Sequence, residues 1–160
     1  MILFILSILI IYLIISHHIS YKIVKKKILN SKKWGLNICC GKTDGGGVNA
    51  DVIRHDKIPN FVLVDVYNLP FKKSQFKNVL CSHTIEHVKY PKKLYNELKR
   101  VGKKVKVVIP PLYDIGAALN FFEHKWIFLS FRKEHRKLPN YIKLPFSSKI
   151  QNLFGQIRNA

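Results

Sequence analysis

The segment 81–91, CSHTIEHVKYP, carries His83, Glu86 and His87 in the order H-x-x-E-H. This order is typical of inverted zinc proteases, in which two histidines share one face of a long helix and a third ligand comes from another helix. Here His83 ends an apolar, partly β-branched run and Pro91 follows His87 by one turn, so a long helix has no room. Three glutamates are available as a third ligand, and nothing distinguishes them: Glu97, Glu123 and Glu134. We therefore predict that the match is accidental and that the chain holds no metal.

Other polar residues stand at the ends of short apolar runs. They are Gly41 after WGLNICC, Asp51 after GVNA, Asp65 after NFVLV and His83 after KNVLC. In an open α/β sheet, ligands bind beyond the carboxyl ends of the strands. We therefore expect these residues to face one site.

The elements that would position them alternate between short strands and helix or loop. We expect strands in the ranges 34–40, 48–53, 60–66, 77–83 and 104–111, with a glycine turn at 45–47 before the second. The run 91–103 predicts a helix, since Pro91 suits a first turn, apolar residues recur at helical spacing and Gly102 suits the end. The pattern predicts an α/β fold with a Rossmann-like, open, mostly parallel sheet. The aromatic and basic segment 118–135 is a candidate helix without a firm assignment.

The first 16 residues are nearly all apolar. With His17, His18 and Ile19 at the interface, the run reaches the length of about 20 residues that a membrane-spanning helix needs. The lysines of the range 22–33 should stay cytoplasmic. We therefore divide the chain into a transmembrane anchor (1–21), a basic juxtamembrane linker (22–33) and a cytoplasmic domain (34–160). A cleaved signal peptide and a buried or interfacial helix are the alternatives.

Composition adds a charge argument and a redox argument. The chain has 160 residues, 48% of them apolar, with 28 Lys and Arg against 9 Asp and Glu, a formal net charge of +19. Such an excess favours anionic membranes or nucleic acid as partners. No nucleic-acid-binding module is recognisable, so we expect no nucleic-acid partner. Cys39, Cys40 and Cys81 form no disulfide framework and are expected to be reduced, buried thiols.

The range 65–103, DVYNLPFKKSQFKNVLCSHTIEHVKYPKKLYNELKRVGK, resembles the class I S-adenosylmethionine-dependent methyltransferases, specifically small type 11 domains. The likeness lies in the acidic residue after the third strand, the Leu-Pro-Phe turn, the Glu-His pair and the Glu-Leu-x-Arg-Val helix. It covers residues 36 to about 111 and implies a reduced methyltransferase fold. The chain departs from the family at Asn37, Cys39, Thr43 and Lys77, and the stretch between Gly41 and Asp51 is too short for a crossover helix.

The resemblance implies roles for particular residues. Asp51 would bind the ribose hydroxyls of the cofactor S-adenosylmethionine, and Gly41 would allow its close approach. Asp65 would accept a hydrogen bond from the adenine amino group. His83 would stand near the methyl group, and His83 or His87 would be the catalytic base. Two apolar residues would lie beside the adenine ring: Val66 and Leu69.

The resulting hypothesis is a membrane-tethered methyltransferase, a transferase with a lipid, quinone or other small-molecule acceptor. The aromatic stretch 121–131 would be an apolar lid over the acceptor, or ordinary core or membrane-surface packing. Two alternatives are a catalytically inactive, membrane-anchored interaction domain and a basic nucleic-acid-binding protein.

Overall fold

A computed structural model describes residues 1–31, 33–55 and 57–154, so the last six residues of the expected domain lie outside the described part. Its main sheet has six strands in the order β3-β2-β1-β4-β5-β7. Their bounds are β1 (Leu36–Ile38), β2 (Val48–Asp51), β3 (Phe61–Leu63), β4 (Val79–Ser82), β5 (Val105–Val108) and β7 (Glu134–His135). The first five pair in parallel and β7 is antiparallel to β5. The predicted open, mostly parallel α/β sheet is confirmed.

The side chains of β1, β4 and β5 are mostly apolar and buried because both faces of the sheet are covered; Asn37, Ser82 and Lys106 are the polar exceptions. Helix α3 (Pro91–Val101) lies on one face, with Leu94, Leu98 and Val101 fully buried. Pro91 begins the helix, where a missing N–H costs nothing, and the Gly102 N–H donates to the Leu98 carbonyl at its end. The predicted helix at 91–103 is thus found within two residues of its expected end.

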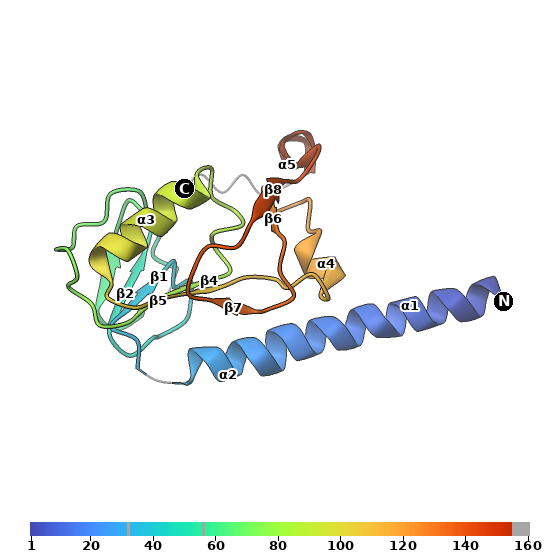
Figure 1. Ribbon diagram of the computed structural model, residues 1–160, viewed down its shortest axis with the longest axis horizontal. Helices are drawn as coiled ribbons and strands as arrows, with labels where there is room; N and C mark the ends of the chain where they lie inside the picture. Colours follow the sequence, from blue (N-terminus) through green and yellow to red (C-terminus); the bar gives the residue numbers. More distant parts are fainter. Residues whose placement is uncertain (32, 56, 155–160) are drawn as a thin grey trace.

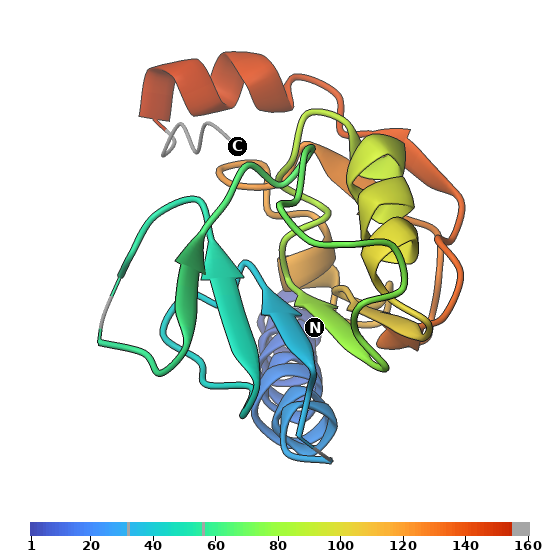
Figure 2. The same cartoon turned by 90° about the vertical axis from the view of Figure 1, so that its left-hand side faces the viewer.

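The N-terminal helix covers the opposite face of the sheet (Figures 1 and 2). It runs through α1 (Ile2–His17), the π-helical segment η1 (His18–Lys25) and α2 (Lys26–Leu29). Ile28 and Trp34 pack there against Leu80 of β4 and Val108 of β5. Among the described residues, the connections after β1, β2 and β3 contain no helix, so the N-terminal helix supplies cover that a crossover helix would otherwise give. The expected linker 22–33 is therefore helical as far as Leu29.

The C-terminal part differs from the helix candidate at 118–135. Helix α4 (Ile115–Ala118) is a single turn, and strand β6 (Trp126–Phe128) pairs with β8 (Tyr141–Lys143). Helix α5 (Ser147–Phe154) closes the described chain. The backbone N–H groups of Lys125 and Trp126 both donate to the Glu86 carbonyl, at 2.8 and 3.2 Å, which holds the chain in an extended path. The helix candidate was wrong because this contact with a distant segment overrides the local pattern.

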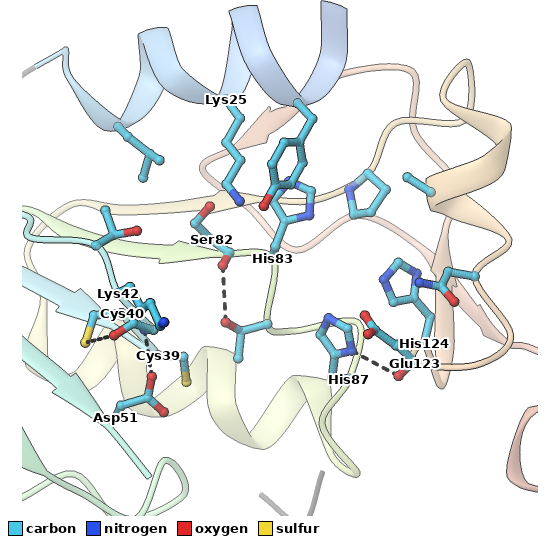
Figure 3. Close-up of a pocket in the computed structure, with 18 of the residues that line it drawn as sticks. Lys25, Cys39, Cys40, Lys42, Asp51, Ser82, His83, His87, Glu123 and His124 are labelled. Atoms are coloured by element: carbon cyan, nitrogen blue, oxygen red, sulfur yellow. Dashed lines mark hydrogen bonds between the residues drawn. The ribbon is translucent and has the colours of Figure 1, made fainter. Parts of the chain in front are cut away.

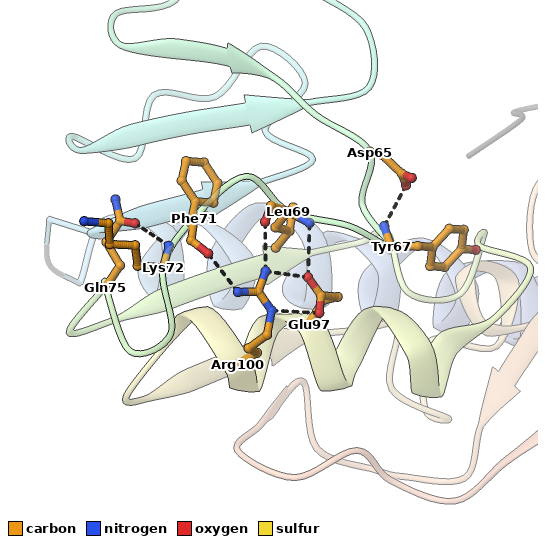
Figure 4. Close-up of polar contacts among 8 residues, drawn as sticks. All are labelled: Asp65, Tyr67, Leu69, Phe71, Lys72, Gln75, Glu97 and Arg100. Carbon is orange, nitrogen blue, oxygen red and sulfur yellow. Dashed lines mark hydrogen bonds and ion pairs between the residues drawn. The ribbon is translucent and has the colours of Figure 1, made fainter.

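Within α3, Glu97 and Arg100 hold the turn that follows β3 (Figure 4). Arg100 donates to both carboxylate oxygens of Glu97 at 2.9 and 2.7 Å and to the carbonyls of Leu69 and Phe71 at 2.8 Å. Glu97 in turn accepts from the Leu69 N–H at 3.0 Å. The Glu-Leu-x-Arg-Val motif is therefore architectural: it fixes the Leu-Pro-Phe turn against the helix.

Candidate functional site

A cavity of about 1410 Å³ opens at the carboxyl ends of β1, β2 and β4 (Figure 3). The strand order reverses between β1 and β4, which is the position where open α/β sheets bind ligands. Typical small-molecule pockets measure about 300–1,000 Å³. This cavity therefore has room for a cofactor and a second molecule.

The backbone turns sharply at the floor of the cavity. Cys39 directly after β1 and His83 directly after β4 both have left-handed φ angles, 49° and 53°. Residues other than glycine, asparagine and aspartate adopt this conformation rarely, at a cost of about 1 kcal/mol or more. The His83 N–H is held by the Val108 carbonyl at 2.8 Å. Two adjacent strands thus end abruptly, which leaves the space beyond them open.

The loop after β1 is fixed by two buried asparagines. Asn37 donates to the Thr43 carbonyl at 2.9 Å, and the Asn49 side-chain oxygen accepts from the Gly45 N–H at 2.9 Å. A Cβ atom on Gly45 would lie 2.6 Å from the Cβ of Asn37. A Cβ atom on Gly47 would lie 2.3 Å from the carbonyl oxygen of Trp34, just before β1. These two glycines are needed for packing against the first strand, so the loop is ordered rather than a plain flexible turn.

Gly41 and Asp51 lie together on the cavity wall. Asp51 is buried, and its two carboxylate oxygens accept from the N–H groups of Gly41 and Val52 at 2.8 and 2.7 Å. A carboxylate has about four lone-pair sites, so each oxygen keeps capacity for another donor. Gly41 has a φ of 54° and nothing within 4 Å of a Cβ position. The geometry therefore allows a ligand to approach this backbone closely.

The other predicted cofactor residues do not line the cavity. Asp65 is exposed, and its Oδ1 accepts from the Tyr67 N–H at 2.8 Å, which closes a local turn (Figure 4). Val66 and Leu69 are buried in the core instead. The structure thus brings Gly41 and Asp51 together on the cavity wall and places Asp65, Val66 and Leu69 outside the lining, in and beside the turn after β3.

The two predicted catalytic histidines both line the cavity. Burial lowers the pKa of His83. Glu86, whose Oε1 lies 3.3 Å from His83 Nδ1, raises that pKa but does not outweigh the effect of burial. Burial raises the pKa of Glu86, but His83, His87 and His124 outweigh it and bring that pKa down to about 2. His87 Nδ1 lies 2.9 Å from the Glu123 carbonyl.

Sequence reasoning missed the wall that the N-terminal helix contributes. Leu13, His17, Tyr21 and Lys25 all line the cavity. Three of them contact one another and His83. The ring centroid of Tyr21 lies 5.5 Å from that of His17 and 5.7 Å from that of His83, and Lys25 Nζ lies 3.9 Å from the Tyr21 ring centroid. The regular spacing of four residues, which puts these side chains on one helix face, was the available signal.

Polar contacts fasten this helix to the rest of the chain. Tyr12 Oη donates to the Tyr113 carbonyl at 2.7 Å, and His17 Nδ1 lies 3.3 Å from Asp114 Oδ1. Ser20 Oγ contacts the buried Lys133 Nζ at 2.8 Å. The helix is therefore part of the site rather than a detached appendage.

Part of this architecture matches a known protein family. A family model described as "Methyltransferase domain" matches residues 42–109, which run from the loop after β1 to the end of β5. The match covers less than half of the chain and identifies residues 42–109 as similar to a methyltransferase domain. The cofactor of this domain family is S-adenosylmethionine, and the open backbone at Gly41 and the carboxylate of Asp51 fit such a group at the switch point of the sheet.

Solved structures similar to the methyltransferase domain include three bacterial and archaeal proteins. One from Thermotoga maritima, described as an SAM-dependent methyltransferase and possible histamine N-methyltransferase, is 19% identical over 59% of this chain and 56% of that chain, with a TM-score of 0.45. A Pyrococcus horikoshii OT3 protein is 15% identical over 86% of this chain and 80% of that chain (TM-score 0.46). An Aquifex aeolicus SAM-dependent methyltransferase is 15% identical over 57% of this chain and 66% of that chain, with a TM-score of 0.41. The chain spans about half the length of several structures that it matches, and no curated protein sequence matches it.

Proposed function

We propose that this chain is an S-adenosylmethionine-dependent methyltransferase held at a membrane, with its domain on the cytoplasmic side and a lipid, quinone or other membrane-proximal small molecule as acceptor. The observation that carries the proposal is the shared cavity. Its floor is the switch point of the sheet, and one wall is the N-terminal helix, which contributes Leu13 and Ile14 beside the polar His17, Tyr21 and Lys25. A site built in this way is adapted to a soluble cofactor at one end and an apolar acceptor at the other.

At the cofactor end, Asp51 would accept hydrogen bonds from the ribose hydroxyls through its spare lone pairs. Gly41 lets the cofactor pass close to the backbone. The bound cofactor supplies a methyl group activated by its sulfonium, so the protein's task is to orient the acceptor and exclude water. His83 is buried and its lowered pKa keeps the imidazole neutral near pH 7, the form that accepts a proton. His83, or His87 beside it, is the base for an acceptor that must lose a proton.

At the acceptor end, the cavity is lined by Leu13 and Ile14 of α1 and by Gly116 and Ala117 of α4. Next to it, Ile115, Leu119 and Phe122 expose 40%, 40% and 56% of their surface. These apolar side chains surround the place where the helix meets the domain. An acceptor with an apolar tail would find continuous apolar contact from the helix into the cavity.

The proposed membrane attachment rests on the N-terminal helix. Within the described residues, the stretch Ile2–Leu29 is the one helix long and apolar enough to cross a membrane by length and composition. Its side chains from Ile2 to Ile11 are almost all exposed, an arrangement that costs free energy in water and none in lipid. The lysines from Lys22 to Lys27 would face the anionic cytoplasmic surface.

The test uses the full chain reconstituted into lipid vesicles and supplied with S-adenosylmethionine carrying a labelled methyl group. We expect the protein to float with the vesicles and the label to appear in the extracted lipid phase when membrane lipids or quinones are present. Gly116→Phe should block the acceptor end without strain, because nothing lies within 4 Å of its Cβ position. Cofactor binding should remain while lipid labelling falls at least about tenfold, a loss of about 1.4 kcal/mol of transition-state binding.

The matched control is Leu153→Phe, which adds an aromatic ring at an exposed position of α5, outside the cavity lining. It should retain labelling. Label that enters only water-soluble acceptors, or a chain that stays out of the vesicle fraction, would contradict the proposal.

A further inference from the structure

We propose that Glu86, His87 and His124 form a binding site for a divalent transition-metal ion of the zinc or ferrous type. One ligand atom from each of the three residues lies within 4.8 Å of the others. This goes beyond methyl transfer, which needs no metal, and it leaves His83 as the base when an ion occupies His87. It also departs from the sequence-based expectation of no metal, and its ligand set differs from the H-x-x-E-H string, since His124 comes from a distant segment and His83 is not a ligand.

Backbone contacts bring the two segments together independently of any ion. The Glu86 carbonyl accepts from the N–H groups of Lys125 and Trp126, and the Trp126 indole N–H donates to the Val88 carbonyl at 2.8 Å. Gln151 of α5 donates to the His124 carbonyl at 2.8 Å from the other side. The ligands are thus placed on a framework that is already rigid, as a metal site requires.

The two imidazoles are prepared as ligands. His87 Nδ1 lies 2.9 Å from the Glu123 carbonyl, which can only accept, so this nitrogen carries the proton and Nε2 keeps its lone pair. Such a hydrogen bond from the second ring nitrogen is the usual support of a metal-bound histidine. His124 Nδ1 is buried and finds no hydrogen-bond partner among the described residues. The rings of His87 and His124 lie 4.7 Å apart, edge to face.

Glu86 supplies the negative charge. The residue is 1% exposed, and neither carboxylate oxygen accepts a well-formed hydrogen bond from the described part of the chain. His83 Nδ1 lies 3.3 Å from Oε1, as an outer-shell partner would. Burying an ionised carboxylate without hydrogen bonds is strongly unfavourable unless a cation compensates. A bound ion would satisfy both Glu86 and the orphaned nitrogen of His124.

The ligand set selects the class of ion. Two imidazoles and one carboxylate suit Zn²⁺ or Fe²⁺, whereas Mg²⁺ prefers an all-oxygen set. Metal–ligand distances are about 2.0–2.2 Å, so side-chain rotations that shift each ligand atom by about 1 Å would bring the three atoms onto one ion. Three protein ligands leave a coordination position open, and His87 and His124 both line the cavity. The ion would therefore offer that position to a ligand in the cavity.

The test is metal binding by the full chain, purified in detergent and freed of metal by a chelator. We expect it to take up one equivalent of Zn²⁺ and no Mg²⁺ at equal concentration, measured by elemental analysis and by competition with a zinc indicator. Glu86→Gln and His124→Ala should each lower the zinc affinity at least about 100-fold, more than the roughly 10–100-fold that an outer-shell loss costs. His83→Ala should retain one equivalent with about tenfold weaker binding.

The control is His18→Ala, which removes an exposed imidazole from the N-terminal helix. It should leave zinc binding unchanged. Binding of S-adenosylmethionine by every variant shows that the domain is folded and keeps this test separate from the proposed enzyme activity. Uptake of no zinc, equal loss in His18→Ala, or loss in His83→Ala without loss in His124→Ala would each overturn the proposal.

Discussion

Lys133 is a buried cation beneath the N-terminal helix. Its ammonium contacts Ser20 Oγ at 2.8 Å, and burial lowers its pKa to about 8. The charged groups that act on it are Asp114 and Glu86, which stabilise the ammonium, and Lys25, which opposes it. The helix therefore docks over a group whose charge costs free energy at neutral pH.

The stability of the folded chain should depend on pH through this residue. Between pH 8 and the ordinary lysine pKa of 10.5, the unfolded chain keeps the proton that the folded chain has lost, so the free energy of unfolding rises with pH. Below pH 8 both states are charged and the burial cost is fully present. We expect chemical unfolding in detergent to show a rise from pH 7.5 to 9 that Lys133→Met removes.

Lys137→Met, a change at an exposed lysine nearby, is the matched control for that pH profile. The buried thiols of Cys39 and Cys81 have raised pKa values and act in the opposite direction above pH 9, equally in all variants. An identical pH slope in Lys133→Met and in the unaltered chain would refute the role of Lys133.

At the same scale, Asp51 and Asp65 show how far single residues could be assigned from sequence. Both follow parallel strands, and both were expected at the site. Asp51 faces the cavity, whereas Asp65 closes a turn with Tyr67 and points away. The position of a residue after a strand is visible in the sequence. The direction in which the following turn sends its side chain is not.

Among the elements, α3 and the turn after β3 depend on one ion pair. Arg100 makes a two-point contact with Glu97 and donates to two backbone carbonyls, so its loss would leave partly buried acceptors without donors. Arg100→Ala should lower the free energy of unfolding by about 1–3 kcal/mol. Urea unfolding measures this change.

Lys92→Ala removes the same charge from an exposed position in the first turn of α3 and serves as control. A cation there opposes the helix dipole, so this variant should be neutral or slightly more stable. Equal destabilisation by both changes would mean that the charge, rather than the hydrogen-bond network, is what α3 needs.

The sequence predicted elements well where local pattern and tertiary packing agree. Apolar runs identified β1 to β5, and spacing with Pro91 and Gly102 identified α3. Prediction failed at 118–135, where contacts with Glu86 impose strands and turns, and it missed that 22–29 is helical and packed. In both places the deciding partner lies far away in sequence, where a local pattern carries no information.

At the scale of the whole molecule, the position of the N-terminal helix decides how deep the helix could reach into a membrane while it still lines the cavity. The first hydrogen bond between the helix and the domain is made by Tyr12, and the side chains of Ile2–Ile11 before it are exposed over a rise of about 15 Å. The hydrocarbon core of a bilayer is about 30 Å thick. In this arrangement, the segment Ile2–Ile11 would reach about half that depth. A full crossing by residues 1–21 would require the hydrogen bond of Tyr12 to Tyr113 and the contact of His17 with Asp114 to break. Under the proposed membrane attachment, the docked arrangement would place the mouth of the cavity close to the membrane surface.

The central claim is that the cavity at the switch point binds S-adenosylmethionine, and calorimetry on the full chain in detergent tests it most directly. We expect micromolar binding, on the order of 7–8 kcal/mol. Asp51→Ala should weaken it ten- to a hundredfold, about 1.5–3 kcal/mol, because the ribose loses a charged acceptor. Asp65→Ala, an equal loss of charge outside the cavity, should change it less than about threefold. The account is contradicted if the unaltered chain shows no binding at millimolar cofactor, or if Asp51→Ala binds as tightly as Asp65→Ala.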